Sequence, residues 1–424
     1  MDLANLNPIY VLIKRLRPSG EITPAQIRLI WLVGIALLIE AYDVALYGLA
    51  TPQIQKAFNI KESEVGLIIS YFRLGVIPAL GLAYLSDIFG RRSILLLTAA
   101  GTTVATLATA FSQDLDQFLL AQTTARVFGY AEVMICYVVI AEEFDERMRG
   151  WATGAIGALG AAGAGVAALV FAAVALLPFG WRALFVIGAG PLLWLLWARR
   201  RLPETRRFAE RKLAQTYLAP LLNLVRAYPL RLVLMIAVTV PLSLASAPAI
   251  ILTPKFLQST HGWAPWQVTL LILGGGMLAL AGALIVGRLS DRIGRRTVLS
   301  FAVIVGIPSL VSFYTWANGP TLVLFWLLII FADLTISILL GGMTAELFPT
   351  SHRTLAAGLR YLTSILAGAA GFLIEAALFN VTQSHGQAIA LMMIPAPLVL
   401  LPIWLLPEAA AKPLETVAPE RDAE

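Results

Sequence analysis

The stretch GRLSDRIGRR, residues 287–296, is rich in Arg and Asp and lies between the apolar runs LLILGGGMLALAGALIV and VLSFAVIVGIPSL. A stretch of similar form, AYLSDIFGRR, occupies residues 83–92. Charged side chains are costly in the interior of a bilayer, whereas apolar runs are suited to it. Each stretch therefore predicts a short loop between two membrane spans, and their likeness predicts a chain built from two copies of one unit.

The composition of the chain is typical of a membrane protein. Of its 424 residues, 59% are hydrophobic and 13% are charged, whereas soluble domains have about half and about a quarter. The lone Cys136 excludes an internal disulfide framework and a Cys-rich metal site. The N-terminal segment MDLANLNPIYVLIKRLRPSG is too polar for a signal peptide, so we expect the first span to direct insertion. The predicted fold class is an all-α, multi-pass membrane protein.

Apolar segments of about 20 residues, the length that crosses a bilayer, recur between Arg28 and Leu406. We predict twelve transmembrane helices, at 28–50, 64–85, 93–111, 118–140, 151–177, 181–198, 231–252, 266–287, 297–316, 320–342, 354–379 and 386–406.

The distribution of Lys and Arg predicts the orientation of these spans. With both termini in the cytoplasm, nearly all Lys and Arg residues, Arg360 among them, fall on the cytoplasmic side, as the positive-inside rule requires. Four exceptions fall on the outer side, Lys56, Lys61, Arg182 and Lys255. Two more, Arg73 and Arg126, fall within the membrane. This orientation accounts for the net charge of +6. The basic segment 199–231 is therefore interpreted as a linker at anionic lipid headgroups, with no nucleic acid as partner.

Several residues recur at a constant offset of 204 positions. They are Asp87 and Asp291, Arg91 and Arg295, Glu142 and Glu346, Arg149 and Arg353, and Pro203-Glu204 and Pro407-Glu408. A tandem copy of six spans is the parallel-repeat plan of transporters whose halves rock about a central site. We predict an N-terminal half at 1–198 with a short cytoplasmic tail, a linker at 199–230, a C-terminal half at 231–406 and a cytoplasmic tail at 407–424.

With these motifs the chain resembles the major facilitator superfamily over nearly its whole length. The second copy matches the family signature G-x-x-x-D-R-x-G-R-R through Gly287, Asp291, Arg292, Gly294, Arg295 and Arg296. The first copy keeps Asp87, Gly90, Arg91 and Arg92 but has Ala83 and Ile88 in place of the glycine and the first basic residue. Glu142 with Arg149-Gly150, the stretch AELFPTSHR and the repeated Leu-Pro-Glu resemble the branch of sugar porters and metabolite:H+ symporters. The resemblance implies two pseudo-symmetric halves of six helices and alternating access.

The resemblance also implies a cytoplasmic gate. In the family, the charged residues of the motif loops form a network when the carrier faces outward, and such a network biases an equilibrium between two states. The residues expected in it are Asp87, Arg91, Glu142, Arg149, Asp291, Arg295, Glu346 and Arg353. The alternative is that these charges only determine topology.

Ionisable residues within predicted spans are functional candidates, because each costs about 2.5–3.5 kcal/mol to insert. Asp43 falls where proton-coupled relatives carry a membrane aspartate, and Arg126 falls where they carry its arginine partner. A carboxylate that releases an arginine on taking a proton couples proton movement to rocking. We predict Asp43 as the proton site and Arg126 as its partner; the alternative is a static buried pair that fixes helix packing.

Other residues are candidates for the substrate cavity, which in this family is lined by the first, fourth, seventh and tenth spans. They are Glu40, Arg73, Glu132, Ser243, Ser246 and Asp333. Pro241 and Pro248 are expected to weaken the seventh helix near the serines. Glu375 is expected near the outer end of its span, where it reaches water.

The substrate is the least determined property of the sequence. Sugar porters grip hydroxyls with amide side chains, but the seventh span, LVLMIAVTVPLSLASAPAIIL, has no Gln or Asn. An apolar cavity with an arginine and a few hydroxyls better suits a small organic acid, aromatic acids included. A sugar or polyol porter, an exporter of lipophilic cations by proton antiport, and a membrane sensor without transport remain as alternatives.

The sequence predicts no enzyme. His261, His352 and His385 lie in separate loops without a nucleophile motif, so no catalytic constellation is expected. We expect no cofactor and no metal, with the proton as coupling ion. The expected partners are a small-molecule substrate and the lipid bilayer, and the expected form is a monomer in the bacterial plasma (inner) membrane.

Overall fold

The computed structural model describes residues 22–199, 218–349, 352–408 and 417, and every element in this part of the chain is helical. The elements are α2 (Pro24–Phe58), α3 (Glu62–Arg73), α4 (Val76–Phe89), α5 (Arg91–Phe111), α6 (Leu115–Glu143), α7 (Glu146–Ala172), α8 (Trp181–Arg199), α10 (Leu218–Ala227), α11 (Pro229–His261), α12 (Pro265–Ile293), α13 (Arg295–Thr315), α14 (Pro320–Leu347), α15 (Arg353–Thr382), α16 (His385–Met392), η2 (Ala396–Val399) and α17 (Leu400–Leu405).

Ten of the helical segments described are long and apolar enough to cross a membrane, so the chain is an integral, multi-pass membrane protein. In α12 the described apolar stretch is shorter, Pro265–Ala279, and α8 is not among the ten. Twelve spans therefore stay a prediction. Large apolar side chains on the outside of the bundle, such as Leu120 at 71% and Met277 at 73% exposure, are suited to lipid.

Two predicted spans are interrupted. The second, 64–85, is divided into α3 and α4 by a turn at Leu74 and Gly75. The last, 386–406, consists of α16, η2 and α17, because Pro395 and Pro397 lack the N–H groups that a continuous helix needs. In contrast, α11 continues as one helix through Pro241 and Pro248. The expected weakening of this helix stays a prediction.

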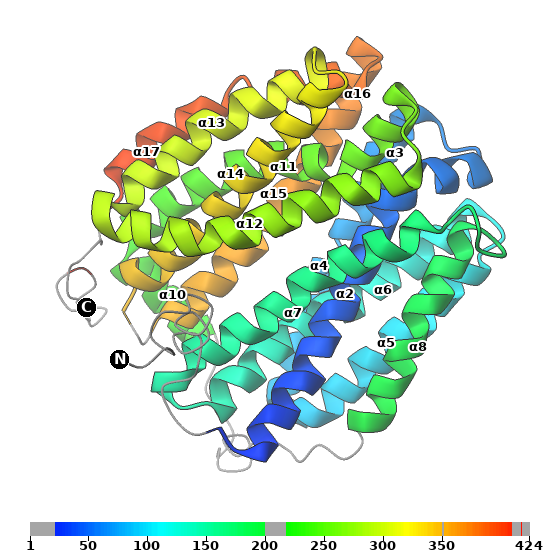
Figure 1. Ribbon diagram of the computed structural model, residues 1–424. Helices are drawn as coiled ribbons and strands as arrows, with labels where there is room; N and C mark the ends of the chain where they lie inside the picture. The colour runs from blue at the N-terminus through cyan, green and yellow to red at the C-terminus, as the bar shows by residue number, and fades with distance from the viewer. Residues whose placement is uncertain (1–21, 200–217, 350–351, 409–416, 418–424) are drawn as a thin grey trace, which may run out of the picture.

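The helices form two bundles that lie side by side (Figure 1). Helices α2 to α8 make the first half and α11 to α17 the second, with α10 in the segment predicted as linker. Across the boundary α2 packs against α11, α3 against α15 and α7 against α12. The predicted N-terminal tail, most of the linker and most of the C-terminal tail lie outside the described residues.

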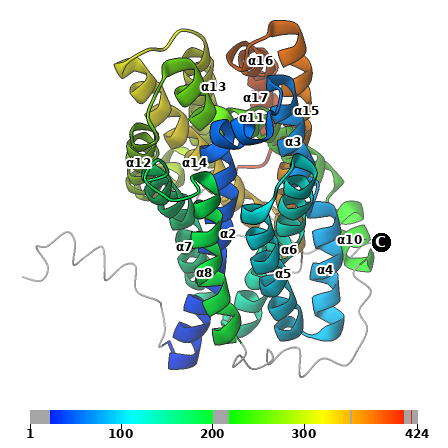
Figure 2. The same ribbon diagram turned by 90° about the vertical axis from the view of Figure 1, so that its right-hand side faces the viewer.

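The long helices run from one end of the molecule to the other (Figure 2). We call the end that carries Asp87 and Asp291 the motif end, and the end that carries Glu62 and His385 the network end. At the motif end Gly90 separates α4 from α5, and Gly294 separates α12 from α13. Their φ values are 95° and 100°, a region that favours glycine. The two copies of the motif thus make the same turn.

Candidate functional site

A buried ionic cluster joins α2 to α6. Glu40 and Asp43 are three residues apart on one face of α2 and both pair with Arg126 of α6. Arg126 Nη1 donates to Glu40 Oε1 at 3.1 Å, and Arg126 Nη2 donates to Asp43 Oδ2. The structure therefore brings together Asp43 and Arg126, the predicted pair, and adds Glu40 as a second carboxylate.

This cluster has more acid than base. Glu40, Asp43 and Arg126 are 7%, 1% and 4% exposed, and within the described part of the chain Glu40 Oε2 and Asp43 Oδ1 accept no hydrogen bond. Gly129 makes room for Glu40, because a Cβ at this position would collide with its carboxylate. Glu132 is also buried and interacts electrostatically with Glu40. Two carboxylates on one guanidinium leave a negative charge that a single proton would neutralise.

Arg73, at the C-terminal end of α3, reaches across the boundary between the halves. Its guanidinium lies over the ring of Phe372, with Cζ 6.0 Å from the centroid. It also lies beside Gly368 of α15 and Ala247 of α11. Arg73 Nε has no hydrogen-bond partner. The side chain is thus placed at the seam of α11 and α15.

A cavity of about 240 Å³ lies inside the second half, between α11, α13, α14 and α15. Its walls are mostly apolar, and they contain three of the predicted cavity residues, Ser243, Ser246 and Asp333. Ser243 Oγ lies 2.8 Å from Ser364 Oγ, so these hydroxyls bridge α11 and α15. Glu40, Arg73 and Glu132, which were also predicted for the cavity, are not among its lining residues.

Arg360 is a cavity residue that the sequence prediction missed. It was expected in the cytoplasm, but it lies seven residues into α15, inside the candidate span Leu355–Thr382, and lines the cavity with Asp333. Among the described residues, its Nε has no hydrogen-bond partner. The signal was available, because 360 lies within the predicted span 354–379. It is therefore the cation that the cavity offers to a ligand.

The charged motif residues form two triads at the motif end, one in each half. Arg91 pairs with Asp87 and, at 3.0 Å, with Glu142. Arg295 pairs with Asp291 at 2.7 Å and with Glu346 at 2.9 Å. Each arginine also donates to a serine that the prediction did not include, Ser86 or Ser290.

Two further gate residues are not part of these triads. Arg353 begins α15, and its Nε has no hydrogen-bond partner. The side chain of Arg149 lies outside the described part of the structure. Glu408, from the repeated Leu-Pro-Glu, accepts hydrogen bonds from the backbone N–H groups of Arg295 and Arg296 and so caps α13.

The network end holds charged residues whose environment was not predicted. The expectation that Glu375 reaches water is wrong, because its side chain is fully buried and bonded to His385. Lys255 was expected in an outer loop, but α11 extends to His261 and buries Lys255 against Glu62. In the described part of the chain, no three His, Cys, Asp or Glu side chains are grouped so as to hold a metal ion.

Comparison with known proteins gives a consistent family assignment. Residues 33–343 and 246–422 match the family model described as Major Facilitator Superfamily. A "Probable 4-methylmuconolactone transporter" of Cupriavidus pinatubonensis is 26% identical over 346 residues, which cover 80% of each chain. The cis,cis-muconate transport protein of Acinetobacter baylyi is 25% identical, with 79% of this chain and 83% of the relative covered. The 3-(3-hydroxy-phenyl)propionate transporter of Escherichia coli is 27% identical, with 66% and 69% covered.

Solved structures share the fold. The crystal structure of a D-xylose-proton symporter superposes with a TM-score of 0.74 at 19% identity, covering 91% of this chain and 99% of that one. At this identity the likeness bears on the arrangement of the helices and not on the solute.

Proposed function

Because the chain belongs to the Major Facilitator Superfamily, we propose that it moves a small organic acid, aromatic acids included, across a membrane in symport with protons. The family and the relatives are transporters, and the chain is not an enzyme. The relatives are named as a probable transporter of 4-methylmuconolactone and as transporters of cis,cis-muconate and 3-(3-hydroxy-phenyl)propionate. The last two solutes are organic acid anions.

The observation that carries the proposal is the cavity around Arg360. A guanidinium in the wall of a cavity attracts a carboxylate, and the surrounding apolar walls suit a hydrocarbon skeleton. The volume of about 240 Å³ exceeds that of about 150 Å³ in an apolar cavity that binds benzene, so one aromatic ring fits. Asp333 and the Ser243–Ser364 pair can accept hydrogen bonds from hydroxyl groups on the same ligand. Arg73 lies beside Ala247 and Gly368, which are each one helical turn from one of these serines, and so places a second cation near the seam.

The ionic cluster of Glu40, Asp43 and Arg126 supports proton coupling. Its two carboxylates share one guanidinium and are buried, and an uncompensated charge in such a place is costly. A proton on Asp43 removes this charge and loosens its contact with Arg126, while Glu40 keeps the guanidinium paired. The proton is thus the only coupling ion that the proposal needs, without cofactor or metal.

The proposal includes the membrane arrangement expected from the sequence. In this arrangement the carrier is a monomer in the bacterial inner membrane. It has twelve spans in two halves, and both termini lie in the cytoplasm. In this arrangement the motif end faces the cytoplasm and the network end faces outward. The two motif triads are the parts of a cytoplasmic gate, now paired within each half.

Uptake by purified protein in liposomes that contain a pH dye tests the function. Without an imposed gradient, cis,cis-muconate or 4-hydroxybenzoate should enter and acidify the interior faster than in protein-free liposomes. D-xylose should do neither. Internal alkalinisation on addition of a lipophilic cation would instead indicate antiport and remove the assignment of Arg360 as a carboxylate ligand.

A further inference from the structure

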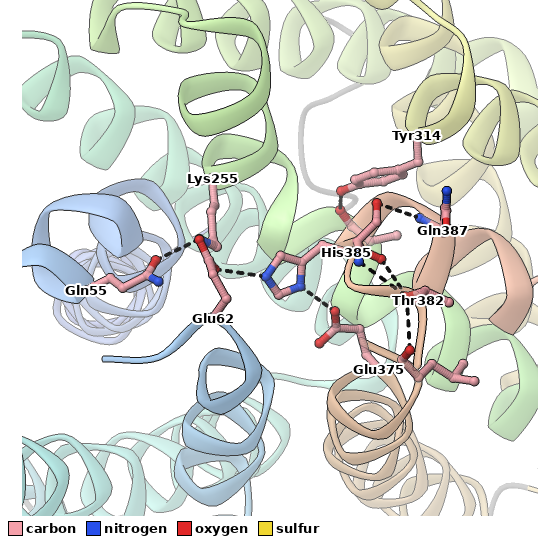
Figure 3. A network of polar contacts seen from close by, with 11 residues as sticks. Gln55, Glu62, Lys255, Tyr314, Glu375, Thr382, His385 and Gln387 are labelled. Atoms are coloured by element: carbon pink, nitrogen blue, oxygen red, sulfur yellow. Dashed lines mark hydrogen bonds and ion pairs between the residues drawn. The ribbon is translucent and has the colours of Figure 1, made fainter. Parts of the chain in front are cut away.

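A polar network crosses the boundary between the halves at the network end (Figure 3). Glu62, the first residue of α3, belongs to the first half. Its Oε2 accepts from Lys255 Nζ of α11 at 2.6 Å and lies 3.1 Å from His385 Nε2 of α16. On the other side of the imidazole, His385 Nδ1 lies 2.5 Å from Glu375 Oε1 of α15. Lys255 also donates to Gln55 of α2 at 2.7 Å.

The inner part of this network is enclosed by both halves. The Glu375 side chain is fully buried and that of Lys255 is 4% exposed, whereas that of Glu62 is 47% exposed. A Cβ on Gly66 of α3 would lie 2.5 Å from Glu375 Oε2, so α3 passes directly over this carboxylate. Glu375 Oε2 has no hydrogen-bond partner among the residues that the structure describes. Glu375 is therefore covered only while the first half is docked at this end.

The contacts of His385 require an additional proton. A neutral imidazole has one N–H group, so it can donate to only one of two carboxylates and must present a lone pair to the other. Both ring nitrogens of His385 lie at hydrogen-bond distance from a carboxylate oxygen. The geometry is satisfied by an imidazolium, or by a neutral imidazole with a protonated Glu375. In either form the site holds one more proton than it would with a neutral imidazole and two ionised carboxylates.

The charges around the site agree with this requirement. Without the proton, Glu62 and Glu375 oppose only Lys255, which leaves a net negative charge. Among the described residues, the other titratable groups that line the cavity beside the site are His261 of α11 and Tyr314 of α13. Tyr314 is bonded to Ala249 and Thr253 within the second half. The N-terminus of α16 disfavours a cation at His385, so the two carboxylates are what retain the proton.

We propose that Glu62, Lys255, Glu375 and His385 form a second proton-binding site, which holds the network end closed while the proton is bound. Loss of the proton leaves the two carboxylates on opposite sides of a neutral ring and weakens the contact between His385 and Glu62, which crosses the boundary. The inference rests on the proposed function, since opening and closing of this end belongs to a carrier with rocking halves. For one proton, the ratio of closed to open molecules falls by up to about tenfold per pH unit above the midpoint.

The test measures the distance between the halves without any solute. Spin labels at Gln113, in the loop after α5, and at Asn318, in the loop before α14, report on the network end; both positions are exposed. The labels are introduced in a Cys136→Ala background, because Cys136 is the only cysteine. Protein in nanodiscs is titrated from about pH 5 to about pH 9, a range that includes the ordinary titration of histidine.

We expect the short-distance population to decrease as the pH rises. In Glu375→Gln the neutral amide replaces the protonated carboxyl, so the short population should persist to the alkaline limit. In His385→Gln the pH response should disappear. His261→Gln, at the same end but outside the network, is the matched control and should titrate like the wild type.

A wild-type distance that does not change with pH would overturn the proposal, and so would a pH response that survives in both His385→Gln and Glu375→Gln. Loss of the pH response in His261→Gln would mean that His261, and not His385, binds the proton, and this result would also overturn the proposal. Because the readout needs no substrate, failure of uptake in liposomes affects the proposed function alone. An invariant distance affects this inference alone.

Discussion

Arg126 is paired with two carboxylates. We therefore expect the loss of one carboxylate to lower the stability of the protein slightly and the loss of both to lower it strongly. The perturbation is a double-mutant cycle with Glu40→Gln, Asp43→Asn and the double variant. Each amide keeps the shape of the side chain and removes its charge. In either single variant Arg126 keeps one carboxylate partner, since Glu40 and Asp43 each contact a different Nη atom.

The magnitudes follow from the burial of the three side chains. Each single variant should lower the free energy of unfolding by about 1 kcal/mol, because a carboxylate that already shares one guanidinium is replaced by a neutral isostere. The double variant leaves a buried guanidinium without a counter-ion, which costs about 3–5 kcal/mol. The coupling energy between the two positions is then about 2 kcal/mol, within the usual range for residues in one network.

Unfolding in mixed micelles, followed by tryptophan fluorescence, measures these free energies. Asp116→Asn, an exposed carboxylate on the same helix as Arg126, is the control and should stay within about 0.5 kcal/mol of the wild type. Additive effects of the two single variants would refute the shared-partner reasoning. A single variant as damaging as the double one would show that one carboxylate alone neutralises Arg126.

Three further predictions concern transport. Asp43→Asn should abolish proton-driven accumulation in liposomes while solute exchange continues; loss of binding alone would make Asp43 a substrate contact. Arg360→Gln should raise the KM for organic acids by about tenfold or more, as expected for loss of a charge-assisted bond, whereas Arg28→Gln at the start of α2 should leave it unchanged. Asp291→Asn should change the accessibility of a cysteine placed at the motif end without changing intrinsic affinity; unchanged accessibility would remove the gate assignment.

The motif triads were predictable because the sequence contains them twice. Asp87, Arg91 and Glu142 recur at a constant offset as Asp291, Arg295 and Glu346, and each set forms the same ion pairs. The pairing of Asp43 with Arg126 was implied by the family resemblance. Ser243, Ser246 and Asp333 were proposed for a substrate cavity because they are polar positions in apolar spans, and they line a cavity of the second half; their role toward a substrate stays a prediction.

The network end was not predictable for a physical reason. Hydropathy places the end of a span where polar residues begin, so Lys255 and Glu62 were assigned to loops. In the structure α11 continues to His261, and the polar residues near its end are buried by the other half. Such burial depends on how α3 docks on α15, which a single sequence does not specify. Arg360 was misplaced because a long side chain close to the end of a span satisfies the positive-inside rule and also reaches a cavity.

The two ionic sites share one feature that bears on coupling. Glu40, Asp43 and Arg126 lie in the first half, and their ion pairs lie within it. The network of Glu62, Lys255, Glu375 and His385 crosses it. Glu40 and Asp43 oppose one permanent cation, Arg126, and Glu62 and Glu375 oppose one, Lys255, so one bound proton neutralises each of these sets. Glu132 adds a further buried carboxylate near the first set. A proton at the first site changes helix contacts within a half, whereas a proton at the second changes how the halves meet. Only the network at the boundary acts directly on closure. Its excess carboxylate therefore lets the pH change the population of the closed state even when no solute is bound.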